Sequence, residues 1–133
     1  MSLPELLKRS DFVSVHVPET PATIGMFDDE RFELMKPSAV FINTSRGKVV
    51  DEDALVRALE QKRIAGAALD VRANEPPVRG ALEAMDNVIL TPHIAAFTEE
   101  GQDRVVTCVC RDVAAVLNGQ ASKNFFNFAT PRR

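Results

Sequence analysis

Four short apolar runs, rich in β-branched residues, most constrain the fold of this 133-residue chain. Each shows little alternation of polar with apolar residues, which is typical of strands buried on both faces of a parallel sheet. The runs are Phe12–Val17, Ala39–Asn43, Ile64–Val71 and Val88–Leu90. Helical patterns fill the gaps between them. This alternation predicts βαβ units and an α/β fold, a partial doubly wound parallel sheet of about four strands flanked by helices.

Three segments have helical signals. The segment from Asp28 to Lys36 stops before a proline, where helices end. Asp51 is placed to cap the next helix, whose apolar face begins with Ala54 and Leu55. A last helix starts at Thr98 and ends at Asn118 and Gly119, a C-cap signal. Its apolar stripe, which we expect to lie in the core, is Val105, Val109, Val113, Val116 and Leu117.

Length and composition suit one soluble globular domain over residues 1–133, since 45% of the residues are apolar and 26% are charged. The residues from Ala121 to Arg133 read as a tail whose Phe125, Phe126 and Phe128 pack on another surface. No linker or repeat interrupts the pattern. We therefore predict a single α/β domain.

Several classes of protein are disfavoured. The longest apolar runs fall short of the roughly 20 residues that span a bilayer, and the N-terminus shows no signal-peptide pattern. Cys108 and Cys110 lie two positions apart in a predicted helix and do not face each other, so we expect neither a local disulfide nor a metal site. A net charge of −3 without a basic cluster disfavours nucleic acid. We predict a cytoplasmic protein with no membrane partner.

The six glycines are widely scattered, and the closest two, Gly66 and Gly80, are fourteen positions apart. This spacing excludes a G-x-G-x-x-G or G-x-x-x-x-G-K phosphate-binding loop within the chain. A dinucleotide pyrophosphate would therefore need a binding loop from elsewhere.

Parallel sheets bind ligands at the carboxyl ends of their strands, and three side chains near these ends form the candidate catalytic set: Arg46, Glu75 and His93. An arginine grips a carboxylate with two parallel hydrogen bonds. A histidine exchanges a proton near neutral pH, and a neighbouring carboxylate orients it. Each residue alone could equally be a surface or turn residue. Their joint occurrence predicts reduction of a 2-oxo acid, or oxidation of a 2-hydroxy acid, with a nicotinamide as hydride carrier.

The motifs that carry this set resemble the D-isomer-specific 2-hydroxyacid dehydrogenases. The matching stretches are Ser10–Pro18, Met35–Pro37, Asn43–Gly47, Val50–Glu52, Ala65–Val71, Asn74–Pro76, Asn87–Val88, Thr91–Ile94 and Gly119–Asn127. They fall in the family's order along nearly the whole chain. The resemblance implies a Rossmann-like fold, with this chain as the second half of a dinucleotide-binding domain plus the closing C-terminal helix.

The resemblance also implies roles for individual residues. Arg46 would bind the substrate carboxylate and carbonyl, His93 would be the acid/base, and Glu75 would be the partner of His93. NAD or NADP would contact residues at the strand ends, with Asp70 on the nicotinamide carboxamide. The implied cofactor-binding residues are Val17, Pro18, Thr44, Ser45, Arg46, Asp70, His93, Ala95 and Ala96.

Two features depart from the family: Arg72 replaces a common phenylalanine, and the family's glycine-rich loop and substrate domain are missing. We therefore predict a fragment or truncated relative that is inactive as an isolated chain. The alternative is an interaction module, like the corepressors that resemble this family, pairing through an exposed sheet edge. Either reading is compatible with a homo-oligomer or a complementary chain. The choice of NAD or NADP and of the 2-hydroxy acid stays open.

Overall fold

The structure is a computed structural model that describes residues 1–124, and the chain divides into two compact units, Met1–Ala95 and Ala96–Arg133. The predicted single domain over residues 1–133 stays a prediction. The predicted packing of Phe125, Phe126 and Phe128 lies outside the described residues.

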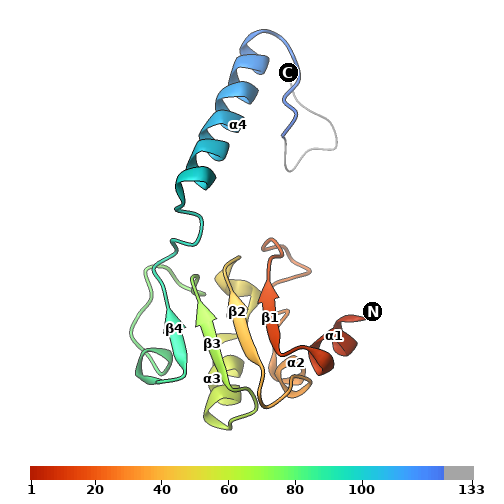
Figure 1. The fold of residues 1–133 in the computed structure, drawn as a ribbon, viewed down its shortest axis with the longest axis vertical. Coiled ribbons are helices and arrows are strands. Elements are labelled where there is room, and N and C mark those ends of the chain that lie inside the picture. Colours follow the sequence, from red (N-terminus) through yellow and green to blue (C-terminus); the bar gives the residue numbers. More distant parts are fainter. Residues whose placement is uncertain (125–133) are drawn as a thin grey trace. The chain divides into compact units, whose positions relative to one another are not determined.

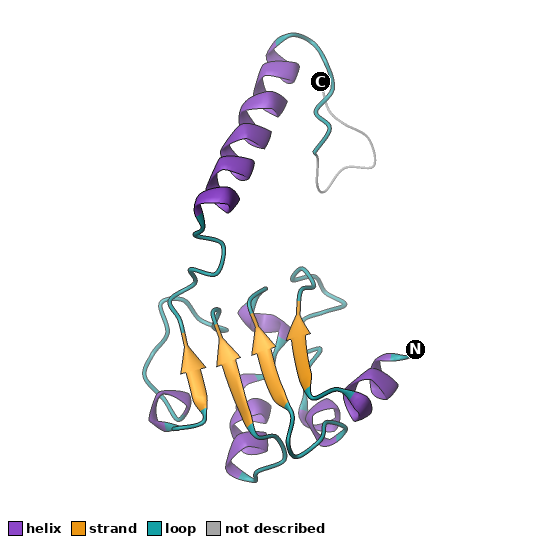
Figure 2. Ribbon diagram, in the orientation of Figure 1, coloured by secondary structure: helices purple, strands orange, loops and turns teal. Residues whose placement is uncertain are grey.

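The first unit is built on a four-stranded parallel sheet with strand order β1-β2-β3-β4 (Figure 1). The strands are β1 (Phe12–Val15), β2 (Val40–Asn43), β3 (Gly66–Leu69) and β4 (Val88–Leu90). Each lies within one of the four apolar runs, so the predicted parallel sheet flanked by helices is confirmed (Figure 2).

The two faces of this sheet differ, and burial alternates along β1. Val13 pairs in register with Phe41, which pairs with Ala67, and all three side chains are buried on what we call the covered face. The open face carries the neighbouring positions of the same strands. Its side chains are exposed or half-buried: Phe12, Ser14, Ile42, Ala68 and Ile89. The predicted burial of the strands on both faces is therefore wrong for these residues, because the described helices α2 (Asp29–Glu33) and α3 (Glu52–Glu60) pack on the covered face.

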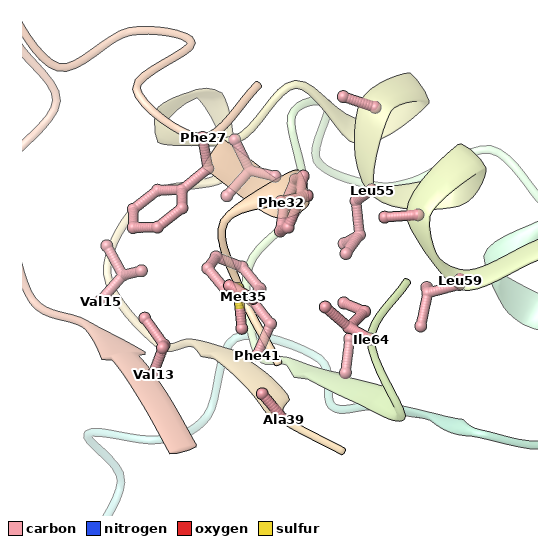
Figure 3. Close-up of a cluster of buried hydrophobic side chains, with 14 of the residues drawn as sticks. Val13, Val15, Phe27, Phe32, Met35, Ala39, Phe41, Leu55, Leu59 and Ile64 are labelled. Carbon is pink, nitrogen blue, oxygen red and sulfur yellow. The ribbon is translucent and has the colours of Figure 1, made fainter. Parts of the chain in front are cut away.

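Aromatic and aliphatic side chains fill the space between the covered face and helices α2 (Asp29–Glu33) and α3 (Glu52–Glu60) (Figure 3). The rings of Phe27 and Phe32 lie 4.9 and 5.2 Å from that of Phe41, measured between centroids. The spacing and tilt of these rings are favourable for aromatic pairs. This cluster holds α2 and α3 against the covered face of the sheet.

Capping side chains set the starts of both helices. Asp28 accepts a hydrogen bond from the Arg31 amide at 3.0 Å, and Asp51 accepts from the amides of Asp53 and Ala54. The predicted Asp51 cap is confirmed, whereas α2 ends at Glu33, three residues earlier than expected. Three further elements were not predicted: α1 (Leu3–Arg9) and the 3-10 turns η1 (Gly47–Val49) and η2 (Leu82–Ala84).

The second unit contains α4 (Glu99–Leu117), which begins and ends where the sequence predicts. Thr98 caps it by accepting from the Gly101 amide at 3.0 Å, and Gly119 follows it with φ +72°. Its apolar stripe is exposed, from 42% at Val116 to 81% at Leu117, so the expectation that this stripe lies in a core is wrong for the described residues. Across residues 1–124, no helix combines the length and apolar character needed to span a membrane.

Candidate active site

The strand register aligns the carboxyl ends of all four strands, since Val15, Asn43, Leu69 and Leu90 pair across the sheet. The residues that follow them therefore emerge at one edge, which we call the carboxyl edge. Arg46 lies in the loop after β2, Glu75 in the loop after β3, and His93 in the segment after β4.

Asn43 organises the loop that carries Arg46. Its side chain is 1% exposed, and its Oδ1 accepts hydrogen bonds from the amide and the hydroxyl of Ser45, both at 3.0 Å. Its Nδ2 donates to the Arg46 carbonyl at 3.0 Å. With these bonds the buried amide holds the loop in one conformation and directs Arg46 away from the sheet.

Asp70 holds the backbone around His93. Its Oδ1 accepts from the Thr91 hydroxyl at 2.6 Å and the Ile94 amide at 2.9 Å, and its Oδ2 accepts from the Ala95 amide at 2.9 Å. His93 lies in the left-handed region with φ +57°, a conformation that costs a non-glycine residue about 1–2 kcal/mol. The three bonds to one carboxylate offset this cost and fix the direction of the His93 side chain.

Burial opposes ionisation of Asp70, but the hydrogen bonds from Thr91, Ala95 and Ile94 outweigh it and lower the pKa of this carboxyl. Asp70 is therefore an ionised acceptor at neutral pH. The whole residue is only 5% exposed.

Glu75 and His93 are in direct contact, with 2.8 Å between Oε2 and Nδ1. The second oxygen, Oε1, accepts from the Arg72 amide at 3.1 Å. The hydrogen bond from His93, then that from the Arg72 amide, lowers the pKa of Glu75, with a further contribution from the charge of Arg46. An ionised carboxylate only accepts, so Nδ1 carries the proton in this pair and Nε2 is left for another partner.

Arg46, Glu75 and His93 line one hollow of about 160 Å³, together with Glu19 and Lys48. A second hollow of about 240 Å³ is also lined by Glu75 and His93, together with Asp70 and Thr91. A larger hollow of about 600 Å³ between η2 and β4 contains none of these residues. The structure therefore brings the predicted catalytic set together at the carboxyl edge.

The predicted cofactor residues are placed unevenly. Thr44, Ser45 and Asp70 lie at the carboxyl edge, and Ala95 is tied to Asp70 through its amide. After β1, Val17 is half-buried against the core, and the Pro18 carbonyl accepts from the Thr23 hydroxyl at 2.6 Å. Ala96 belongs to the second unit.

Sequence reasoning missed several residues that shape the site: Asn43, Thr91, Lys48 and Glu19. The signal for Asn43 was available, because a polar residue that ends a buried apolar run needs an internal partner. Thr91 gave no such signal, since its partner Asp70 is 21 positions away in the sequence. Lys48 and Glu19 approach each other at 3.8 Å on the rim of the first hollow.

Within residues 1–124, no group of three His, Cys, Asp or Glu side chains is arranged to bind a metal ion. Both cysteines, Cys108 and Cys110, are exposed free thiols on α4.

Known proteins share both the sequence and this architecture. Glyoxylate reductase of Thermococcus onnurineus is 46% identical over 127 residues, which are 96% of this chain and 38% of that protein. D-mandelate dehydrogenase of Rhodotorula graminis, in a holo form, has a TM-score of 0.88 at 34% identity, covering 98% of this chain and 39% of its own. A D-isomer specific 2-hydroxyacid dehydrogenase of Xanthobacter autotrophicus, solved with NADPH and MES, has a TM-score of 0.84 at 39% identity, covering 94% and 51%.

The chain thus spans about 38% of the length of the first of these relatives. Residues 1–95 match the family described as "D-isomer specific 2-hydroxyacid dehydrogenase, NAD binding domain". Both the resemblance and the Rossmann-like fold it implied are confirmed, and the family's members are NAD-dependent oxidoreductases. The chain belongs to the D-isomer specific 2-hydroxyacid dehydrogenase family, and its first 95 residues are part of the NAD-binding domain.

Proposed function

We propose that this chain carries the catalytic residues of an NAD(P)-dependent oxidoreductase that interconverts D-2-hydroxy acids and 2-oxo acids. The observation that carries the proposal is the 2.8 Å contact between Glu75 Oε2 and His93 Nδ1 in the hollow that Arg46 also lines. A carboxylate, an imidazole and a guanidinium around one hollow suit a substrate with a carboxylate next to a carbonyl.

Arg46 is the group that binds the substrate carboxylate. Its guanidinium is permanently charged and offers a planar fork of donors that matches a carboxylate. One donor, Nη1, bonds to the Ser45 carbonyl at 2.7 Å, and the other guanidinium N–H groups have no protein partner within residues 1–124. A donor close to the C2 oxygen would also polarise the carbonyl.

His93 is the acid/base. Glu75 holds the proton on Nδ1 and orients the ring, so Nε2 faces the substrate oxygen. In the reductive direction C2 gains a hydride and the carbonyl oxygen takes a proton from His93, which gives the 2-hydroxy acid. In the oxidative direction His93 accepts the hydroxyl proton as the hydride leaves C2.

A bound nicotinamide dinucleotide supplies or accepts that hydride. Asp70 suits its carboxamide, because a carboxylate oxygen accepts two hydrogen bonds and Oδ2 accepts only one within the described residues. Thr44, Ser45 and Ala95 would line the same end of the cofactor, and Val17 and Pro18 would lie on its adenosine side. The NADPH-bound relative and the NAD-binding family support either NAD or NADP.

Substrates of the relatives support the substrate class. Glyoxylate and mandelate, in the names of two of them, are a 2-oxo acid and a 2-hydroxy acid. We expect the same class here.

A hybrid enzyme tests the proposal. The chain replaces the matching 127 residues of the Thermococcus onnurineus glyoxylate reductase, and NADH-dependent reduction of glyoxylate is measured. We expect turnover, and a loss in kcat/KM of about 10²–10⁴-fold in the His93→Gln variant. The control is Arg57→Met, which removes the exposed ion pair between Arg57 of α3 and Asp29 of α2. A hybrid that binds NADH while His93→Gln leaves its rate unchanged would refute the proposal.

The 133-residue chain by itself should bind NADH weakly or not at all, because it contains no glycine-rich phosphate loop. Calorimetric titration with NADH checks this expectation. Micromolar affinity for the isolated chain would contradict it.

We propose further that a second copy or a complementary chain covers part of the sheet, as in the interaction-module alternative. Support comes from the open face, where Phe12 is 71% and Ile89 67% exposed, since exposed apolar clusters often mark interfaces. The free thiols on α4 support a reducing, cytoplasmic location. Light scattering checks the assembly, and a strict monomer at high concentration would exclude the self-paired form.

A further inference from the structure

Arg72 follows β3 by three residues, and its side chain makes three hydrogen bonds to two carboxylates. Its side chain is only 11% exposed and lies between two carboxylates, Glu52 at the start of α3 and Glu83 in η2. An arginine so shielded from water is unusual unless it is paired on several sides.

The guanidinium makes a two-pronged contact with one carboxylate and a third contact with the other. Nε and Nη2 donate to Glu52 Oε1 and Oε2 at 3.2 and 3.1 Å, and Nη1 donates to Glu83 Oε1. Charge-assisted, paired bonds of this kind are both stronger and more directional than single ones. Despite the opposing effect of burial, the contacts raise the pKa of Arg72.

Both carboxylates also hold the backbone of the loop after β3. Glu52 Oε1 accepts from the Ala73 amide, and Glu83 Oε2 accepts from the Gly80 amide at 2.8 Å. The loop is thus tied near its start and near its end, with Glu75 between the two ties. The Arg72 side chain joins these ties into one network.

This network reaches the candidate active site through the backbone. The Arg72 amide donates to Glu75 Oε1 at 3.1 Å, while Glu75 Oε2 accepts from His93. The Arg72 carbonyl and the Ala73 amide nitrogen also lie directly against Gly47, so closely that a side chain at position 47 would overlap them. The backbone at positions 72 and 73 therefore contacts both the Glu75 side chain and Gly47, which follows Arg46 in its loop.

We propose that Arg72 is a positioning residue for the active site: its guanidinium, locked between Glu52 and Glu83, fixes the backbone that orients Glu75 toward His93 and spaces it from Arg46. The consequence for catalysis rests on the proposed function, whereas the positioning itself rests on the contacts alone.

A nearby ion pair provides a matched control. Arg57 lies in α3 and makes a two-pronged contact with Asp29 at 2.9 and 2.6 Å. Its side chain is 45% exposed and that of Asp29 54%, so solvent weakens the pair, and it touches no residue of the loop after β3. Arg57→Met removes the same chemical contact from the same helix without reaching Glu75.

The test is an NMR titration of the Glu75 carboxyl in the full 133-residue chain. Arg72→Met should shift the pKa of Glu75 upward toward its ordinary value, because the amide that stabilises the carboxylate is no longer held in place. Arg57→Met should leave the titration of Glu75 unchanged. A Glu75 pKa that stays as low in Arg72→Met as in the wild type would overturn the proposal.

A second variant distinguishes two possible causes of a change in the pKa of Glu75: the positioning of the loop and the charge of Arg72 itself. Glu52→Ala removes a negative charge, and by charge alone it would lower the pKa of Glu75 further. If Glu52 and Arg72 act by holding the loop, the pKa of Glu75 rises instead. The two explanations thus predict opposite signs, and a fall would overturn the proposal. Glu52→Ala also decides the matter should Arg72→Met fail to give a folded spectrum.

The catalytic consequence is measured in the hybrid enzyme. We expect Arg72→Met to lower kcat on the order of 10–100-fold, as misplacement of catalytic groups does, and Arg72→Lys to restore only part of it, because an ammonium lacks the planar fork. If the hybrid shows no activity, the proposed function is wrong. The NMR titration of Glu75 then still tests whether Arg72 positions Glu75. If the hybrid is active and Arg72→Met is as fast as wild type, the positioning role in catalysis fails alone.

Discussion

The two faces of the sheet carry similar residues but have different surroundings. Phe41 on the covered face is 0% exposed, whereas Phe12, on the neighbouring strand and the open face, is 71% exposed. Ala67 and Ala68 differ in the same way although they are adjacent in β3. Burial in this protein thus follows from what packs on a face, here α2 and α3, and the hydrophobicity of a residue does not determine it.

The largest expected effect tests this comparison with one residue type. Phe41→Ala should lower the free energy of unfolding by about 3–5 kcal/mol, since it opens a cavity among packed rings. Phe12→Ala should change it by no more than about 0.5 kcal/mol. Urea unfolding followed by circular dichroism measures both. A large loss of unfolding free energy for Phe12→Ala would contradict the difference between the two faces, because it would mean that the open face is covered in solution.

The next effect uses the adjacent alanines of β3. Ala67→Leu should destabilise the first unit by about 1–3 kcal/mol, because the added atoms have no space under α3. Ala68→Leu points to the open face and should be nearly neutral. The two variants share a strand and a substitution, so equal losses of stability in thermal unfolding would contradict the assignment of the faces.

A smaller effect concerns the helix caps. Asp51→Ala should cost about 1 kcal/mol in the unfolding of the first unit, because α3 is packed on the covered face. Thr98→Ala removes an equivalent cap from α4 and should reduce the helicity of α4 without affecting the unfolding of the sheet. Asp51→Asn, which retains an acceptor, serves as the control. NMR amide signals report on the two units separately. If Thr98→Ala destabilised the sheet as much as Asp51→Ala does, the expectation that the cap of α4 does not affect the sheet would be wrong.

The smallest effect is a pH dependence of stability at η2, whose Leu82 is buried in the core. Hydrogen bonding from Arg72 lowers the pKa of Glu83 from 4.5 to about 2. Because the folded pKa is the lower one, the stabilisation is complete above about pH 4.5 and is lost as the pH falls toward 2. Other carboxyls with lowered pKa values, Asp29 and Asp70 among them, contribute to the same acid loss.

The informative quantity is therefore a difference between variants. The Tm of wild type should fall more steeply between pH 4.5 and 2 than that of Glu83→Gln, which cannot ionise there. Parallel curves for the two proteins would show that the Arg72–Glu83 pair contributes nothing to stability.

Local signals predicted the elements well. Asp51, Thr98 and Gly119 mark helix ends because caps depend on a few neighbouring residues. The apolar runs locate the four strands because short runs rich in β-branched and aromatic residues favour strands, even where one face of the sheet is open. The helix α1 was missed, although Pro4 in its first turn is a typical start signal.

Long-range contacts could not be predicted in the same way. The stripe on α4 has the spacing of a core-facing helix, yet its valines are exposed within the described chain. Arg72 stands where the resemblance implies a phenylalanine, and its partners Glu52 and Glu83 are 20 and 11 positions away. Sequence spacing does not reveal such partners, because they depend on how the loops cross the carboxyl edge.

The sequence by itself determined the order of strands and helices, the α/β class and the position of Arg46, Glu75 and His93 after successive strands. These properties depend on local patterns and on the rule that parallel strands share their carboxyl edge. Only the tertiary structure decided which face of the sheet is covered and that Asp70 and Arg72 hold the two segments that carry His93 and Glu75. It also showed directly the contact between Glu75 and His93 that the resemblance implied. Such contacts join residues 11 to 25 positions apart, and two of them join the segments that follow the paired strands β3 and β4.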